Sequence, residues 1–150
     1  MTTTKQVTGL HHLGVPVKSM EASLAWYREM LGVEPTFVQQ AEEGAGLDAA
    51  TQLPDTRLRY AFVELGNTII EFLEYERPTP REHDRRNCDV GAVHICFEVD
   101  DIHATYEAML AKGVRFNGPP NLITEGPIEN HWFCYFRDPD GIQLEIFQTP

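Results

Sequence analysis

The sequence predicts an α+β fold built from two tandem βαβββ modules. The main observation is an internal repeat, in which a strand, a capped helix and three further strands occur twice in the same order. A histidine of the opening strand, His12 or His94, precedes the predicted helix cap, Ser19 or Asp101, by seven residues in both copies. The length of 150 residues and the hydrophobic fraction of 42% fit one globular domain of ordinary size, which we place at residues 8–149.

Module one is expected at residues 9–76. Its opening strand is Gly9–Val17, and Ser19 caps a helix that Gly32 ends. The side chains expected on the inward face of this helix are Met20, Leu24, Tyr27 and Leu31. Three strands are then expected, at residues 34–39, 57–65 and 68–75. The polar segment 40–56 is longer than most loops, and we expect it to be either a lid or a plain insertion.

Module two is expected at residues 91–148, after a charged linker at residues 77–90. Its opening strand is Ala92–Val99, and Asp101 caps a helix that Gly113 ends. The side chains expected on the inward face of this helix are Ile102, Tyr106, Met109 and Leu110. Three strands are then expected, at residues 114–117, 132–137 and 142–147.

Charge and hydropathy exclude two classes of partner. With 12 Lys and Arg against 23 Asp and Glu, the net charge of -11 would repel a phosphate backbone, so we expect no nucleic-acid partner. The amino-terminal residues hold no apolar stretch of signal-peptide length, and no segment approaches the roughly 20 apolar residues that span a bilayer. We therefore expect a cytoplasmic protein with no membrane partner. The odd number of cysteines, without CxxC spacing, fits reduced thiols in that compartment.

Strand alternation selects four candidate metal ligands. Successive side chains of a strand point to opposite faces. The side chains expected on the helix side are Leu13, Val15 and Val17 in the first module and Val93, Ile95, Phe97 and Val99 in the second. His11 is expected on the helix side as well, in a structural role. His12 and His94 then face away from the helices, and so do Glu71 and Glu145 of the closing strands.

A carboxylate within an apolar strand is costly to bury unless it is paired or coordinates a metal. Two imidazoles and two carboxylates suit one divalent Fe, Mn, Co, Ni or Zn ion with open positions for water. The alternative is that the histidines are satisfied core groups. The glutamates would then pair with Arg59, Arg115 or Arg137.

Several motifs carry a resemblance to a known family. They are His12-Leu-Gly-Val-Pro-Val17 with Trp26-Tyr27 and Leu31-Gly32, Asn67-Thr-Ile-Ile-Glu-Phe72, Val93-His-Ile-Cys-Phe-Glu-Val-Asp-Asp101, and Asp138-Pro-Asp-Gly-Ile-Gln-Leu-Glu145. With them the chain, from Gly9 to Gln148, resembles the vicinal oxygen chelate superfamily. This superfamily includes glyoxalase I, methylmalonyl-CoA epimerase, extradiol dioxygenases and the fosfomycin and bleomycin resistance proteins.

The resemblance implies how the modules assemble and what the protein binds. The metal ligands would come from the first and last strands of each module, which here means His12, Glu71, His94 and Glu145. The two sheets would curve into a cleft around the metal, and such short chains are commonly homodimers. The substrate would be a small molecule whose vicinal oxygens are captured by a metal acting as a Lewis acid.

Three functions fit this resemblance. The first is isomerase or lyase chemistry of the glyoxalase or epimerase kind, through a metal-stabilised enolate, with Glu145 or Glu71 removing a proton next to a carbonyl. The second is an extradiol-type dioxygenase, because Tyr135 and Glu145 fit the tyrosine-to-glutamate half of that signature. The third is a non-catalytic antibiotic-binding protein. The residues expected to be catalytic are Glu145, Glu71 and Tyr135, and Arg59, Tyr60 and Tyr135 are possible substrate contacts.

Overall fold

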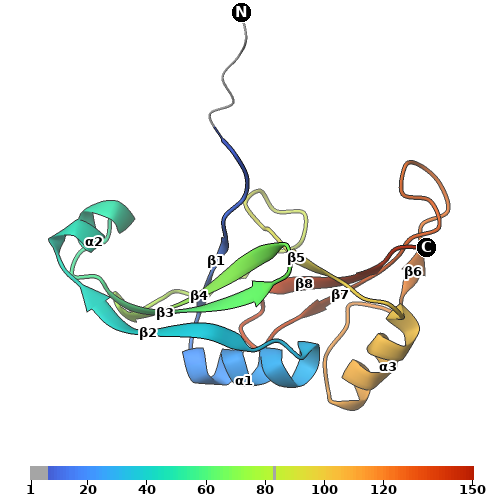
Figure 1. Cartoon of the computed structure of the whole chain (residues 1–150), viewed down its shortest axis with the longest axis horizontal. Coiled ribbons are helices and arrows are strands. Elements are labelled where there is room, and N and C mark those ends of the chain that lie inside the picture. Colours follow the sequence, from blue (N-terminus) through green and yellow to red (C-terminus); the bar gives the residue numbers. More distant parts are fainter. Residues whose placement is uncertain (1–6, 83) are drawn as a thin grey trace, which may run out of the picture. The chain divides into compact units, whose positions relative to one another are not determined.

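The computed structural model describes residues 7–82 and 84–150, which belong to two compact units that meet in sequence between Pro80 and Arg81. The amino-terminal residues considered above for an export signal lie largely outside the described residues. Each unit contains a strand, a helix and three further strands (Figure 1). The α+β class and the two-module organisation are therefore confirmed.

The first unit contains a four-stranded sheet in the order β1-β4-β3-β2. Its elements are β1 (Leu13–Val17), α1 (Met20–Leu31), β2 (Pro35–Glu43), α2 (Ala45–Thr51), β3 (Arg57–Leu65) and β4 (Thr68–Arg77). β1 runs parallel to β4, whereas β3 is antiparallel to both of its neighbours. α1 covers one face of the sheet, and α2 lies where β2 passes to β3, on the side away from α1 (Figure 1).

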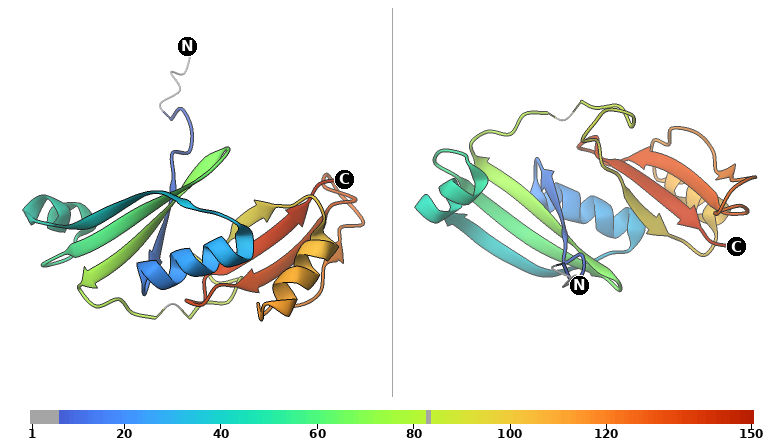
Figure 2. Two further views of the ribbon diagram at one scale, coloured as in Figure 1. Left: turned by 60° about the horizontal axis from the view of Figure 1, so that its bottom comes forward. Right: turned by 90° about the horizontal axis from the view of Figure 1, so that it is seen from above.

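The second unit repeats the strand order of the first, as β5-β8-β7-β6. Its elements are β5 (Ile95–Glu98), α3 (Ile102–Ala111), β6 (Asn121–Leu122), β7 (Trp132–Arg137) and β8 (Gln143–Gln148). β5 runs parallel to β8. α3 packs along one face of this sheet (Figure 2), and the backbone N–H of Ile102 donates to the side-chain oxygen of Gln148 at 2.8 Å. Among the helices that the structure describes, none is long and apolar enough to cross a membrane.

The core of each unit lies between its helix and its sheet. Tyr27 of α1 and Phe72 of β4 are fully buried, with ring centroids 4.7 Å apart. In the second unit Phe136 and Ile146 are fully buried on the face that α3 covers. We call the opposite face of each sheet the open face. Because strand residues alternate, the neighbours of these core residues, including Glu71, point to the open face.

The helix caps are those that the sequence predicts. The Ser19 hydroxyl accepts a hydrogen bond from the Ala22 N–H at 3.3 Å, and the Asp101 carboxylate accepts one from the Ala104 N–H at 2.9 Å. Gly32 ends α1 with a φ of 68°, a left-handed conformation that a glycine adopts without strain. Both predicted caps form, so the seven-residue spacing from histidine to cap reflects the same local structure in the two units.

Ser19→Ala is expected to lower the free energy of unfolding by about 1 kcal/mol, because the Ala22 N–H loses its acceptor. Denaturant unfolding followed by circular dichroism measures this change. Ser19→Asp is the matched control, since aspartate keeps an acceptor oxygen at the cap and should retain most of the stability. Equal destabilisation by both variants would contradict the capping role.

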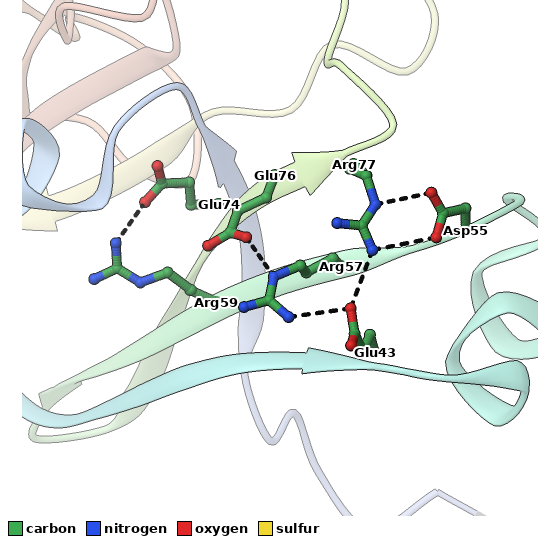
Figure 3. A network of polar contacts seen from close by, with 7 residues as sticks. All are labelled: Glu43, Asp55, Arg57, Arg59, Glu74, Glu76 and Arg77. Atoms are coloured by element: carbon green, nitrogen blue, oxygen red, sulfur yellow. Dashed lines mark hydrogen bonds and ion pairs between the residues drawn. The ribbon is translucent and has the colours of Figure 1, made fainter.

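The segment at residues 40–56, expected to be a loop, is strand and helix up to Thr51, and only residues 52–56 are turn and loop. β2 continues to Glu43 and α2 follows it. Cross-strand ion pairs explain the longer strand, since Arg57 of β3 contacts Glu43 at 3.0 Å and Glu76 of β4 at 2.6 Å. Arg77 adds contacts to Asp55 at 2.8 Å and to Glu43 at 3.0 Å (Figure 3). The polar residue Glu43, which favours a loop in the sequence, therefore forms ion pairs that stabilise the end of β2.

Four expectations for the second module are wrong. The strand expected at residues 114–117 is only an isolated bridge between Phe116 and Phe136. The strand expected from Ala92 begins at Ile95, because the chain still turns at Ala92, whose N–H donates to the Asp89 carbonyl at 2.9 Å. Val93 is consequently 77% exposed instead of facing the helix, and Leu110, expected on the inward face of α3, is 44% exposed.

Candidate metal centre

Each unit brings one histidine and one glutamate together through the same strand register. In the first unit β1 and β4 pair in parallel so that Gly14 lies beside Glu71. In the second unit β5 and β8 pair so that Cys96 lies beside Glu145. His12 and His94 precede these strand partners by two residues, and they lie just before the first residue of β1 and β5. The parallel register therefore places each histidine next to its glutamate.

The two pairs make their contact through the same atom types. The Nε2 atom of His12 lies 3.3 Å from Oε2 of Glu71, and the Nε2 atom of His94 lies 3.0 Å from Oε2 of Glu145. Two adjacent ligands that are each about 2.1 Å from an octahedral ion lie about 3.0 Å apart. The donor set and its spacing thus fit a divalent ion. Among the described residues no group of three or more His, Cys, Asp or Glu side chains converges on one point, so each unit supplies two of the four predicted ligands.

In the first unit, small and apolar groups surround the histidine–glutamate pair. A Cβ atom on Gly14 would lie 3.4 Å from the Leu73 side chain and 3.8 Å from the Glu71 carboxylate, so the Gly14 backbone packs directly beside both side chains. Phe62 of β3 lies opposite Glu71 in the sheet. Phe62 belongs to an aromatic cluster on the open face, with ring centroids 5.4 Å from Tyr60 and 5.9 Å from Phe37.

His11 contacts the metal-ligand candidate instead of facing the helix. Its Nδ1 atom lies 2.9 Å from Nδ1 of His12, and both histidines are exposed. The expectation of a helix-facing His11 is wrong because β1 begins only at Leu13, so strand alternation does not extend to residue 11. A hydrogen bond at Nδ1 orients the His12 ring and leaves Nε2 directed at Glu71.

In the second unit, the pair lies deeper and next to a phenol. Glu145 is 6% exposed and pairs across β7 and β8 with Tyr135, whose ring centroid lies 5.3 Å from that of His94. Burial, followed by the charge of Glu145, raises the pKa of the Tyr135 phenol. Partial burial and the Glu145 carboxylate raise the pKa of the Cys96 thiol to about 12. Both groups therefore remain protonated at neutral pH, and Tyr135 can donate a hydrogen bond on the open face.

The alternative in which arginines neutralise the glutamates does not hold for Arg59 and Arg137. Arg59 turns to the helix side, where it contacts Glu21 of α1 at 2.7 Å and Glu74 at 3.4 Å. Arg137 donates to backbone carbonyls. Glu71 and Glu145 contact the histidines instead, as the pairing in the sequence repeat predicts.

Phe62 and Gln143 lie beside the candidate ligands, although no sequence pattern marks them as site residues. Their positions follow from strand pairing, because Phe62 faces Glu71 across β3 and β4 and Gln143 lies two residues before Glu145 on β8. Tyr135 holds in the second unit the place that Phe62 holds in the first. The two histidine–glutamate pairs are therefore alike, whereas their immediate surroundings differ.

Two of the known proteins that are similar in sequence to this chain are named epimerases. A 2-epi-5-epi-valiolone epimerase from an Actinomyces species is 33% identical, over 94% of this chain and 79% of that protein. An ethylmalonyl-CoA/methylmalonyl-CoA epimerase from Cereibacter sphaeroides is 32% identical, over 93% of this chain and 97% of that protein. These epimerases support an enzyme with isomerase-type chemistry.

The fold is also that of solved glyoxalase-family structures. A glyoxalase family protein from Bacillus cereus superposes with a TM-score of 0.75 at 20% identity, over 99% of this chain and 97% of that chain. The sequence model of the family described as "Glyoxalase/Bleomycin resistance protein/Dioxygenase superfamily" matches residues 9–146, which is nearly the whole sequence. The chain therefore belongs to the glyoxalase/bleomycin resistance protein/dioxygenase superfamily.

Proposed function

We propose that the protein is a metal-dependent epimerase acting on a small molecule with vicinal oxygens. The observation that carries the proposal is the repeated pair in which a histidine Nε2 atom lies 3.3 Å or 3.0 Å from a glutamate Oε2 atom. The proposed ligands of one Fe, Mn, Co, Ni or Zn ion are His12, Glu71, His94 and Glu145. Each unit supplies a complete pair, so the proposal holds for ligands from one chain or from two chains of a homodimer.

A bound divalent ion would supply Lewis acidity that polarises the substrate carbonyl and acidifies the neighbouring C–H bond. Glu71 and Glu145 are the proposed acid–base residues, one removing the proton from that carbon and the other returning a proton to its opposite face. The C–H bond that breaks on one face is replaced by a C–H bond on the other. The product is therefore the epimer, and no oxidant or reductant is consumed.

Tyr135 has a separate role in the proposal. Its phenol remains protonated because burial and the Glu145 charge raise the pKa. It therefore donates a hydrogen bond to a substrate oxygen and does not act as the base. The aromatic cluster of Phe37, Tyr60 and Phe62 gives the open face of the first unit an apolar surface against which carbon atoms of the substrate can pack.

The proposal predicts metal-dependent exchange of a carbon-bound proton with solvent. The purified protein is stripped with a chelator, reconstituted separately with each of the five ions and mixed in D2O with methylmalonyl-CoA or 2-epi-5-epi-valiolone. We expect one metal ion per chain by elemental analysis, and deuterium at the epimerised carbon by NMR only in the reconstituted protein. Oxygen uptake with catechols in the Fe(II) protein would instead indicate the dioxygenase, and failure to retain any ion would overturn the proposal.

A further inference from the structure

Among the described residues, Arg137 of the second unit contacts no carboxylate, whereas every arginine of the first unit does. Arg57 and Arg77 each contact two carboxylates, and Arg59 contacts Glu74 (Figure 3). Arg28, the other arginine of that unit, contacts Glu34 at 2.7 Å. Every arginine of the first unit is therefore neutralised by an acidic side chain.

The partners of Arg137 are neutral. One guanidinium nitrogen donates to the Gly141 carbonyl and another to the Arg85 carbonyl, both at 3.4 Å. When the Gln143 amide is oriented so that its nitrogen donates to Asn87 Oδ1 at 2.8 Å, its oxygen accepts from Arg137. Within the described part of the chain Arg137 forms no ion pair with a carboxylate. A half-buried guanidinium without a counter-ion stands out in a protein with a net charge of -11.

Strand register places this cationic group next to the candidate metal centre. Across β7 and β8, Tyr135 pairs with Glu145 and Arg137 pairs with Gln143. The two pairs occupy neighbouring rows of one face, separated by two residue rises of about 3.3 Å each. A substrate of a few carbon atoms could therefore reach from Glu145 to Arg137.

We propose that Arg137, together with Gln143 and Asn87, binds an anionic group of the substrate whose reacting carbon lies at Glu145. This inference rests on the proposed function for the role of Glu145. A guanidinium presents donors in a fork that matches a carboxylate or a phosphate. The 3.4 Å contacts to the two carbonyls are long for hydrogen bonds. Shorter, charge-assisted hydrogen bonds to an anion would be stronger than the contacts that they replace. Gln143 is only 4% exposed, and its fixed amide holds the guanidinium in place.

Titration of the metal-free protein with small probes tests this site without reference to catalysis. The probes are malonate, inorganic phosphate and the neutral malonamide, and the readout is the side-chain amide resonance of Gln143 in a nitrogen-15 NMR spectrum. We expect at least one of the two anions to bind and malonamide to be without effect. Stronger binding of malonate assigns the site to a carboxylate, whereas stronger binding of phosphate assigns it to a phosphate.

Substitutions show whether Arg137 is responsible. Arg137→Gln is expected to weaken anion binding at least 10-fold, and Arg137→Lys to weaken it less, because the charge remains. Arg115→Gln, which removes an exposed arginine of the same unit, is the matched control and should bind as the wild type does. Equal binding of malonamide, or unchanged anion binding in a folded Arg137→Gln variant, would overturn the inference. Because the titration needs neither metal nor turnover, its failure is distinguishable from failure of the epimerase proposal.

Discussion

Glu145→Gln is expected to lower the rate of epimerisation about 100- to 10,000-fold and to reduce the bound metal, while the fold remains intact. The factor is that typical of removing an acid–base residue. The amide has nearly the shape of the carboxylate, so the buried position in β8 stays filled. It lacks the negative charge that binds a cation, and its amide oxygen is too weakly basic to remove a proton. Deuterium exchange, elemental analysis and far-UV circular dichroism measure the three effects.

The matched control for this variant is Glu107→Gln, which removes the same charge from an exposed position on α3. It should keep both the metal content and the exchange rate. Full activity with full metal occupancy in Glu145→Gln would show that Glu145 is neither ligand nor acid–base residue. Loss of activity with metal retained would keep the acid–base role and remove Glu145 from the ligand set.

The candidate site could be predicted from the sequence because it depends on local periodicity. Alternation along β4 puts Phe72 into the core and Glu71 on the open face, and alternation along β8 does the same for Ile146 and Glu145. The spacing from His12 to the Ser19 cap repeats in the second module. Such patterns are set by neighbouring residues, so they survive without knowledge of the tertiary structure.

The errors occur where distant partners decide the local structure. Residues 40–43 are polar enough for a loop, yet they extend β2 because Arg57, far along the chain, supplies a partner for Glu43. The strand containing Ile95 starts late because the turn at Asp89 and Ala92 delays its pairing with β8. Periodicity in a single sequence carries no information about either contact.

Phe72→Ala is expected to have the largest effect on stability, lowering the free energy of unfolding by about 3–5 kcal/mol. Phe72 is fully buried against the ring of Tyr27, so truncation leaves a cavity between α1 and the sheet. Phe37→Ala is the matched control, because Phe37 lies in the same sheet but is 44% exposed on the open face. Its cost should be at most about 1 kcal/mol, since surface substitutions change stability little. Denaturant unfolding of the two variants under identical conditions gives both values.

The same substitution tests how the core affects the candidate metal centre. Burial of Phe72 fixes the register and orientation of β4, and the next side chain, Glu71, reaches His12 only in that orientation. We therefore expect Phe72→Ala to weaken metal binding under conditions in which the variant is still folded, although Phe72 lies on the opposite face. Phe72→Leu, which fills more of the cavity, should restore part of both properties. Unchanged metal affinity in a folded, destabilised Phe72→Ala variant would show that packing beneath β4 does not position Glu71.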